Sequence, residues 1–68
     1  MVDIYKVIDR ATGKVLEATT DPDRADWFLE FFCECKGRDA FVTQTNDMKD
    51  VYVRREMFRR AMRHEVVA

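Results

Sequence analysis

The segment from Pro22 to Lys36 most constrains the fold, because it carries an aromatic-rich helical pattern with both of its ends marked. At 100° per residue, four of its side chains fall within an arc of about 80°, namely Ala25, Phe28, Phe32 and Cys35. Opposite them runs an acidic strip, which consists of Asp26, Glu30 and Glu34. Asp21 suits the N-cap, Pro22 the first helical position and Gly37 a left-handed C-cap. The segment therefore predicts an amphipathic helix whose apolar face packs on a sheet.

A β-hairpin is predicted before this helix. Residues 2–8 and 15–19 have the β-branched and aromatic composition of strands. Between them, Asp9 can bond its own backbone to open a turn, and Gly13 can adopt the positive φ that a tight turn needs. Residues 39–45 predict a third strand, which ends at the turn-prone Asn46-Asp47 pair.

The segment after the third strand has two interpretations. Residues 51–53 fit either a short fourth strand or the first turn of a helix. In the second case the helix runs on through residues 54–66, with Val51, Phe58 and Met62 on one face. We favour a helix from about residue 54 and leave both interpretations of residues 51–53 open.

The predicted fold class is α+β, in the order ββαβ(β)α. A small antiparallel sheet, made of the hairpin plus the third strand, is packed by the central amphipathic helix, and a basic helix ends the chain. The 68 residues leave room for one domain, 1–68, with a single core. Its 47% of hydrophobic residues argue against wholesale disorder.

Charge is distributed unevenly along the chain, although the net charge is only −1. Residues 1–50 hold seven Lys and Arg against eleven Asp and Glu, a balance of −4. Residues 51–68 hold five Arg against two Glu, a balance of +3. Such asymmetry says more about binding partners than the total charge does, and it makes the last predicted helix the basic end.

Residue content excludes several enzymatic chemistries. The chain has no serine, a single histidine and no glycine-rich loop, which excludes a serine nucleophile and a phosphate-binding loop. A cysteine nucleophile would need His64 as its base, and we interpret Cys33 and Cys35 as small residues in the core or at its boundary. Side chains at i and i+2 point about 200° apart on a helix, so these two thiols cannot share one metal ion. We therefore expect no enzyme, no catalytic residue, no metal and no cofactor.

The expected location is the cytoplasm. No stretch of 18 or more apolar residues predicts a membrane-spanning helix. The first four residues lack the basic and apolar regions of a signal peptide. Two cysteines only two positions apart also fit a reducing compartment better than a secreted disulfide scaffold.

An arginine row on the last predicted helix is the first candidate binding surface. It consists of residues at i, i+4 and i+8, namely Arg55, Arg59 and Arg63. Arginine suits bidentate contacts with carboxylates or phosphates. The alternative is a solvated helix face, in which Glu56 pairs internally with Arg60.

Trp27 and Phe31 are the second candidate, because they lie at the edge of the apolar stripe of the central helix. If this edge is left uncovered, it is a natural interface anchor. The alternative is that the last helix or the 47–53 segment covers it.

These surfaces lead to a hypothesis of a non-enzymatic protein-interaction module. It would be a small accessory or modulator protein of bacterial or phage type, an inhibitor or adaptor, that binds a larger protein partner. A homodimer is a further expectation, because the acidic strip of a second copy would match the arginine row.

The alternative hypothesis is a nucleic-acid-binding accessory domain that uses the C-terminal arginine-rich helix. The isoelectric point of 5.7 and the acidic body disfavour it, because they repel phosphates. Helical periodicity also assigns Phe58 to the core, which leaves no aromatic platform among the arginines.

Overall fold

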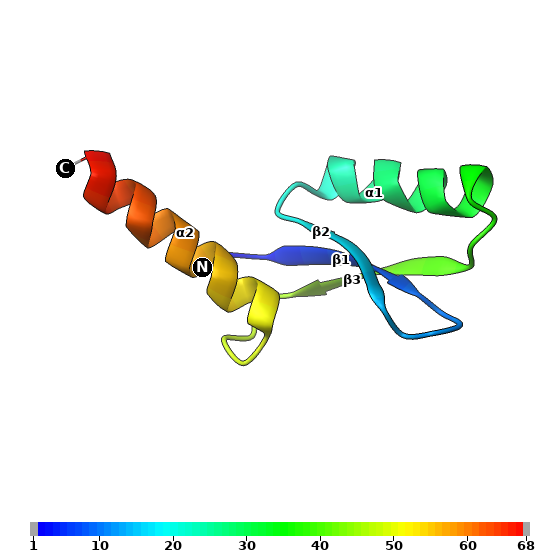
Figure 1. Cartoon of the computed structure of the whole chain (residues 1–68), viewed down its shortest axis with the longest axis horizontal. Helices are drawn as coiled ribbons and strands as arrows, with labels where there is room; N and C mark the ends of the chain where they lie inside the picture. The colour runs from blue at the N-terminus through cyan, green and yellow to red at the C-terminus, as the bar shows by residue number, and fades with distance from the viewer. Residues whose placement is uncertain (1, 68) are drawn as a thin grey trace.

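The computed structural model describes the backbone of residues 2–67 and the side chains of residues 2–63. Its elements are, in order, β1 (Ile4–Asp9), β2 (Val15–Thr19), α1 (Pro22–Glu30), the π-helix η1 (Phe31–Cys35), β3 (Ala40–Thr45) and α2 (Val51–Val67). The strands form an antiparallel sheet in the order β2-β1-β3, and α1 lies alongside it (Figure 1). The predicted α+β class and element order are confirmed. Residues 51–53 are the first turn of α2 and not a fourth strand.

Asp9 organises the hairpin turn. The Asp9 N–H donates to the Lys14 carbonyl at 2.9 Å, and the Gly13 N–H donates to the Asp9 carbonyl at 2.7 Å. Gly13 has a φ of +73°, as the turn prediction required. The Asp9 carboxylate accepts hydrogen bonds from the Ala11 N–H and from the Arg38 guanidinium, both at 3.0 Å. These bonds, led by the one from Ala11, hold the pKa of Asp9 below its ordinary value, and they tie the hairpin to the segment after η1.

The predicted helix from residue 22 to residue 36 is confirmed at its start, where the Asp23 N–H donates to the Asp21 carboxylate at 3.0 Å. Its last part is a π-helix, in which the Lys36 N–H donates to the Phe31 carbonyl at 3.3 Å. A π-helix turns through a smaller angle per residue than an α-helix, so the side chains beyond residue 31 leave the predicted stripe. Cys33 and Cys35 are exposed and are not core residues, although the Cys33 thiol donates to the Ala40 carbonyl at 3.9 Å, at the boundary of the core.

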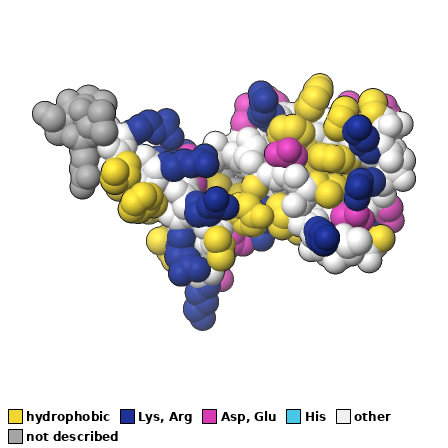
Figure 2. Space-filling view, viewed as in Figure 1, with side chains coloured by type: hydrophobic (Ala, Val, Ile, Leu, Met, Phe, Trp, Pro, Cys, Tyr) yellow, Lys and Arg dark blue, Asp and Glu magenta, His cyan; other side chains and the backbone are white. Residues whose placement is uncertain are grey.

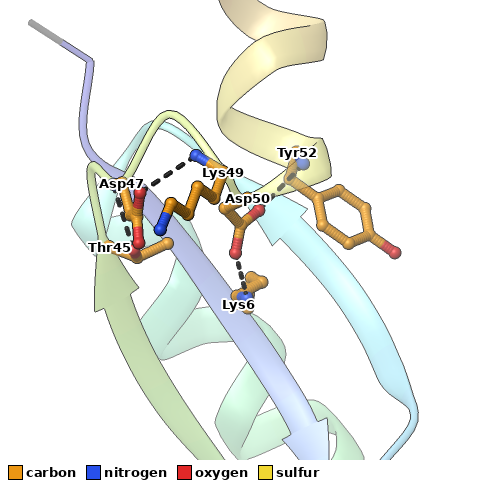
Figure 3. A network of polar contacts seen from close by, with 6 residues as sticks. All are labelled: Lys6, Thr45, Asp47, Lys49, Asp50 and Tyr52. Atoms are coloured by element: carbon orange, nitrogen blue, oxygen red, sulfur yellow. Dashed lines mark hydrogen bonds and ion pairs between the residues drawn. The ribbon is translucent and has the colours of Figure 1, made fainter.

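Helix α1 and the start of α2 cover opposite faces of the sheet. Val7, in the central strand, is 0% exposed, and Ala25 of α1 is also buried. Side chains alternate along a strand, so the neighbouring Lys6 points to the other face. Figure 3 shows Lys6 reaching toward Asp50 with α1 behind the sheet. The buried cluster on this second face consists of Val2, Ile4 and Val53.

After its first turn, α2 leaves the sheet and projects from the molecule (Figure 1). The principal-axis extents are 45 × 22 × 14 Å. The Cα radius of gyration is 13.6 Å, whereas a compact domain of this length has a radius of about 11 Å. The helix therefore presents most of its surface to solvent, which determines where binding surfaces lie.

Candidate functional site

Trp27 lies on the outer side of α1 and is 58% exposed. Its ring stacks on that of Phe31, with centroids 5.5 Å apart and planes 5° from parallel. Four exposed acidic side chains lie on the same helical segment, namely Asp23, Asp26, Glu30 and Glu34. The Lys36 ammonium group lies over the Phe31 ring, 5.5 Å from its centroid. Neither α2 nor the segment before it covers Trp27. We call this aromatic pair with the four acidic residues the α1 surface.

The outer side of α2 carries an exposed apolar stripe. It consists of Val51, Phe58 and Met62, and Phe58 is 67% exposed. The prediction that Phe58 belongs to the core is wrong. The physical reason is that α2 docks through Val53, which is 0% exposed and lies about 140° to 180° around the helix from the residues of the stripe. We call this stripe, together with the flanking Arg54, Arg55 and Arg59, the α2 surface; in Figure 2, Lys and Arg side chains lie close to the hydrophobic ones along α2.

Glu56 pairs with three of the arginines of α2. Its carboxylate lies 3.5 Å from Arg60, 3.7 Å from Arg63 and 4.0 Å from Arg59. The predicted Glu56–Arg60 pair is thus confirmed. Among the described side chains, Arg54 and Arg55 have no carboxylate at ion-pair distance. The predicted row is therefore partly neutralised toward its C-terminal end, and the strongest uncompensated charge lies at its start.

Three depressions mark the surface of the two helices. One of about 480 Å³ lies beside Phe58 and is lined by Val51, Arg54, Arg55, Phe58 and Arg59. Another, of about 360 Å³, lies beside Trp27 and is lined by Asp21, Asp23, Arg24 and Trp27. The third, of about 270 Å³, is a groove between β2 and α2, with Tyr52, Arg55, Glu56 and Arg59 on its helical side. In the first two, an exposed aromatic ring lies beside charged side chains, which are all arginines at Phe58 and are two aspartates with Arg24 at Trp27. An exposed ring of this kind is a property of interaction surfaces.

Asp50 holds α2 in place. Its carboxylate accepts the Tyr52 N–H at 2.9 Å, which caps the helix, and it also forms an ion pair with the Lys6 ammonium group of β1 (Figure 3). The hydrogen bond from Lys6, followed by that from Tyr52, holds the pKa of Asp50 below its ordinary value. The direction in which α2 projects therefore depends on one carboxylate and on the burial of Val53.

Metal binding and cysteine catalysis can each be compared with the described residues. Among them, no group of three or more His, Cys, Asp or Glu side chains is arranged to hold a metal ion. The side chain of His64, the base that a cysteine nucleophile would need, lies outside the described side chains. In residues 2–67, no helix is both long and apolar enough to cross a membrane.

The structure brings Trp27 and Phe31 together, and it places the Arg55, Arg59 and Arg63 row on a different helix that points away from them (Figure 1). The predicted residues therefore form two surfaces and not one site. Sequence reasoning missed Val51, Phe58 and Met62 as surface residues. A signal was present, because Arg55 lies within about 20° of Met62 around the helix and would be drawn into any core that buried the stripe.

Comparisons with models of protein families, with curated proteins and with solved structures found no match.

Proposed function

We propose that this protein is a non-enzymatic protein-interaction module, a small accessory or modulator protein that acts by binding another protein. The observation that carries the proposal is the exposure of Trp27 and Phe58 on two helices, each beside a charged depression. Burial of such a ring in a protein interface contributes about 2 kcal/mol or more. Two surfaces of opposite charge also allow an adaptor to hold two partners, or an inhibitor to cover a site. We place this activity in the cytoplasm.

Replacing Trp27 with alanine is expected to remove partner binding while the protein stays folded. Because the ring is exposed, the stability lost is that of its stacking on Phe31, about 1 kcal/mol. Affinity should fall about 30-fold or more. The measurement is capture from lysate by the immobilised protein, with circular dichroism to check folding.

Met48→Ala is the matched control, because Met48 is an exposed apolar residue outside both surfaces. It should leave capture unchanged. Capture that survives Trp27→Ala would rule out the α1 surface as the anchor. Capture that survives charge reversal of Arg55, Arg59 and Arg63 would rule out the arginine row as a binding surface.

A second candidate function is nucleic-acid binding by α2. The observation that favours it is the projection of the arginine helix away from the acidic body, which reduces repulsion of a polyanion (Figure 1). Three phosphate contacts would give a slope of log K against log salt near −2.7, about a 40-fold loss between 50 and 200 mM salt. R55E/R59E/R63E should abolish such binding. A chain that binds neither duplex nor single strands at about 50 mM salt does not have this function.

A further inference from the structure

We infer that the partner of the α1 and α2 surfaces is a second copy of this chain, with the α1 surface of each copy against the α2 surface of the other. The inference rests on the proposed function, since it names the partner for the same two surfaces. It goes beyond the expected match of the acidic strip with the arginine row, because it adds the exposed rings of Trp27 and Phe58 and makes both contacts reciprocal.

The first argument is shape and charge. Each surface has an exposed aromatic ring beside a charged depression: arginines line the one at Phe58, and two aspartates with Arg24 line the one at Trp27. Trp27 of one copy fits the depression beside Phe58, where Arg54 and Arg55 can also lie over the indole face. Phe58 in turn fits the depression beside Trp27, which is lined by Asp21, Asp23 and Arg24 and where the Arg24 guanidinium can lie over the Phe58 ring.

The second argument is that other uses of the α2 surface are less favourable. Pairing two α2 stripes would place Arg54, Arg55 and Arg59 of one copy near the same residues of the other, which costs free energy in a desolvated interface. The carboxylates beside the sheet are already paired, Asp50 with Lys6 and Asp39 with Arg10, so they are less available to the arginines of α2. The acidic α1 surface matches α2 better than either.

The third argument is that the α1 and α2 surfaces of one copy cannot contact each other. Helix α2 projects away from α1, so the two surfaces of one copy lie on different parts of an elongated molecule (Figures 1 and 2). One helix face is also small compared with the roughly 800 Å² that each partner buries in a stable interface. A two-fold arrangement uses both faces of both copies, which doubles the contact area and closes the assembly as a dimer.

The test is a charge exchange between two variants. R54E/R55E reverses the α2 surface; both positions lie in the first turns of α2, where glutamate favours the helix dipole. D26K/E30K reverses exposed positions of the α1 surface. In a dimer of either variant alone, both α1–α2 contacts would then bring like charges together.

The expected result, by light scattering and sedimentation at about 100 μM and low salt, is a dimer for the parent and a monomer for each variant alone. Dissociation constants should rise by at least about 30-fold. Mixing the two variants should restore a dimer of one copy of each, because every contact is then between opposite charges. K14E/K49E changes the net charge by the same amount as R54E/R55E, at exposed positions outside both surfaces, and should remain dimeric.

Three outcomes would overturn the inference: a monomeric parent, a variant that remains dimeric alone, or folded variants that do not assemble when mixed. Oligomers that grow with concentration would overturn the two-fold closure. The proposed function can be tested separately from the dimer. If the mixed variants stay monomeric while Trp27→Ala still removes capture of a different protein, the second copy is the wrong partner and the interaction module stands.

Discussion

Replacing Val7 with aspartate is expected to abolish cooperative folding. Val7 is 0% exposed and lies in the central strand, paired with Glu17 on one side and Val42 on the other. A carboxylate at this position would be buried under α1 without a partner, which costs several kcal/mol. A chain of 68 residues has a total stability of only about 3–10 kcal/mol. Far-ultraviolet circular dichroism should therefore show no cooperative thermal transition.

Two further valine variants make this experiment quantitative. Val7→Ala should keep a cooperative transition and lose about 2–3 kcal/mol in urea unfolding, because it removes buried methyl groups and leaves a cavity. Val51→Asp should change stability by less than about 0.5 kcal/mol, because Val51 is 54% exposed and an acidic residue suits the first turn of a helix. If Val7→Asp unfolds with nearly the parent's midpoint, the assignment of the core is wrong.

Local sequence signals were sufficient for most of this fold. Asp9 and Gly13 fix the hairpin turn through backbone geometry, and Asp21 caps α1 through a bond two residues away. Signals of this kind depend only on neighbouring residues, so they can be read directly from the chain. The exposed acidic strip of Asp26, Glu30 and Glu34 was predictable for a related reason, because three carboxylates on one side of a helix cannot be buried without partners.

The position of α2 depends on contacts between distant residues, which local patterns do not contain. Val53 is buried against Val2 and Ile4, and Asp50 pairs with Lys6, 44 residues away in the chain. Helical periodicity shows that two sides of a helix differ, but not which side meets the sheet. The π-helix is a second example, because no residue type in 31–35 marked the change in phase that exposes Cys33 and Cys35. The direction in which α2 projects and the π-helix were therefore unpredictable from sequence, whereas the two candidate surfaces were already expected on separate helices.

Replacing Asp50 with alanine should release α2 from the sheet. The change removes the cap on the Tyr52 N–H, which costs about 1 kcal/mol. It also leaves the half-buried Lys6 ammonium without its carboxylate, which adds about 1.5–3 kcal/mol. Asp50→Asn separates the two effects, because asparagine caps helices as well as aspartate but carries no charge. Urea unfolding at pH 7 should thus rank the parent above Asp50→Asn, and Asp50→Asn above Asp50→Ala.

The Asp50 carboxylate should also make the free energy of unfolding depend on pH in the acidic range. The pKa of Asp50 is lowered in the fold, chiefly by the hydrogen bond from Lys6, so the folded state binds the proton less tightly than the unfolded chain does. Its contribution is therefore complete above the ordinary value of 3.8 and is lost as the pH falls through and below that value. Asp50→Asn should flatten the fall in stability between pH 5 and pH 3, although part of it should remain because the pKa of Asp9 is lowered in the same direction. Asp3→Asn, at an exposed position, is the matched control. An Asp50→Asn variant that loses stability with acid as steeply as the parent would show that the Lys6–Asp50 pair does not hold α2 in place.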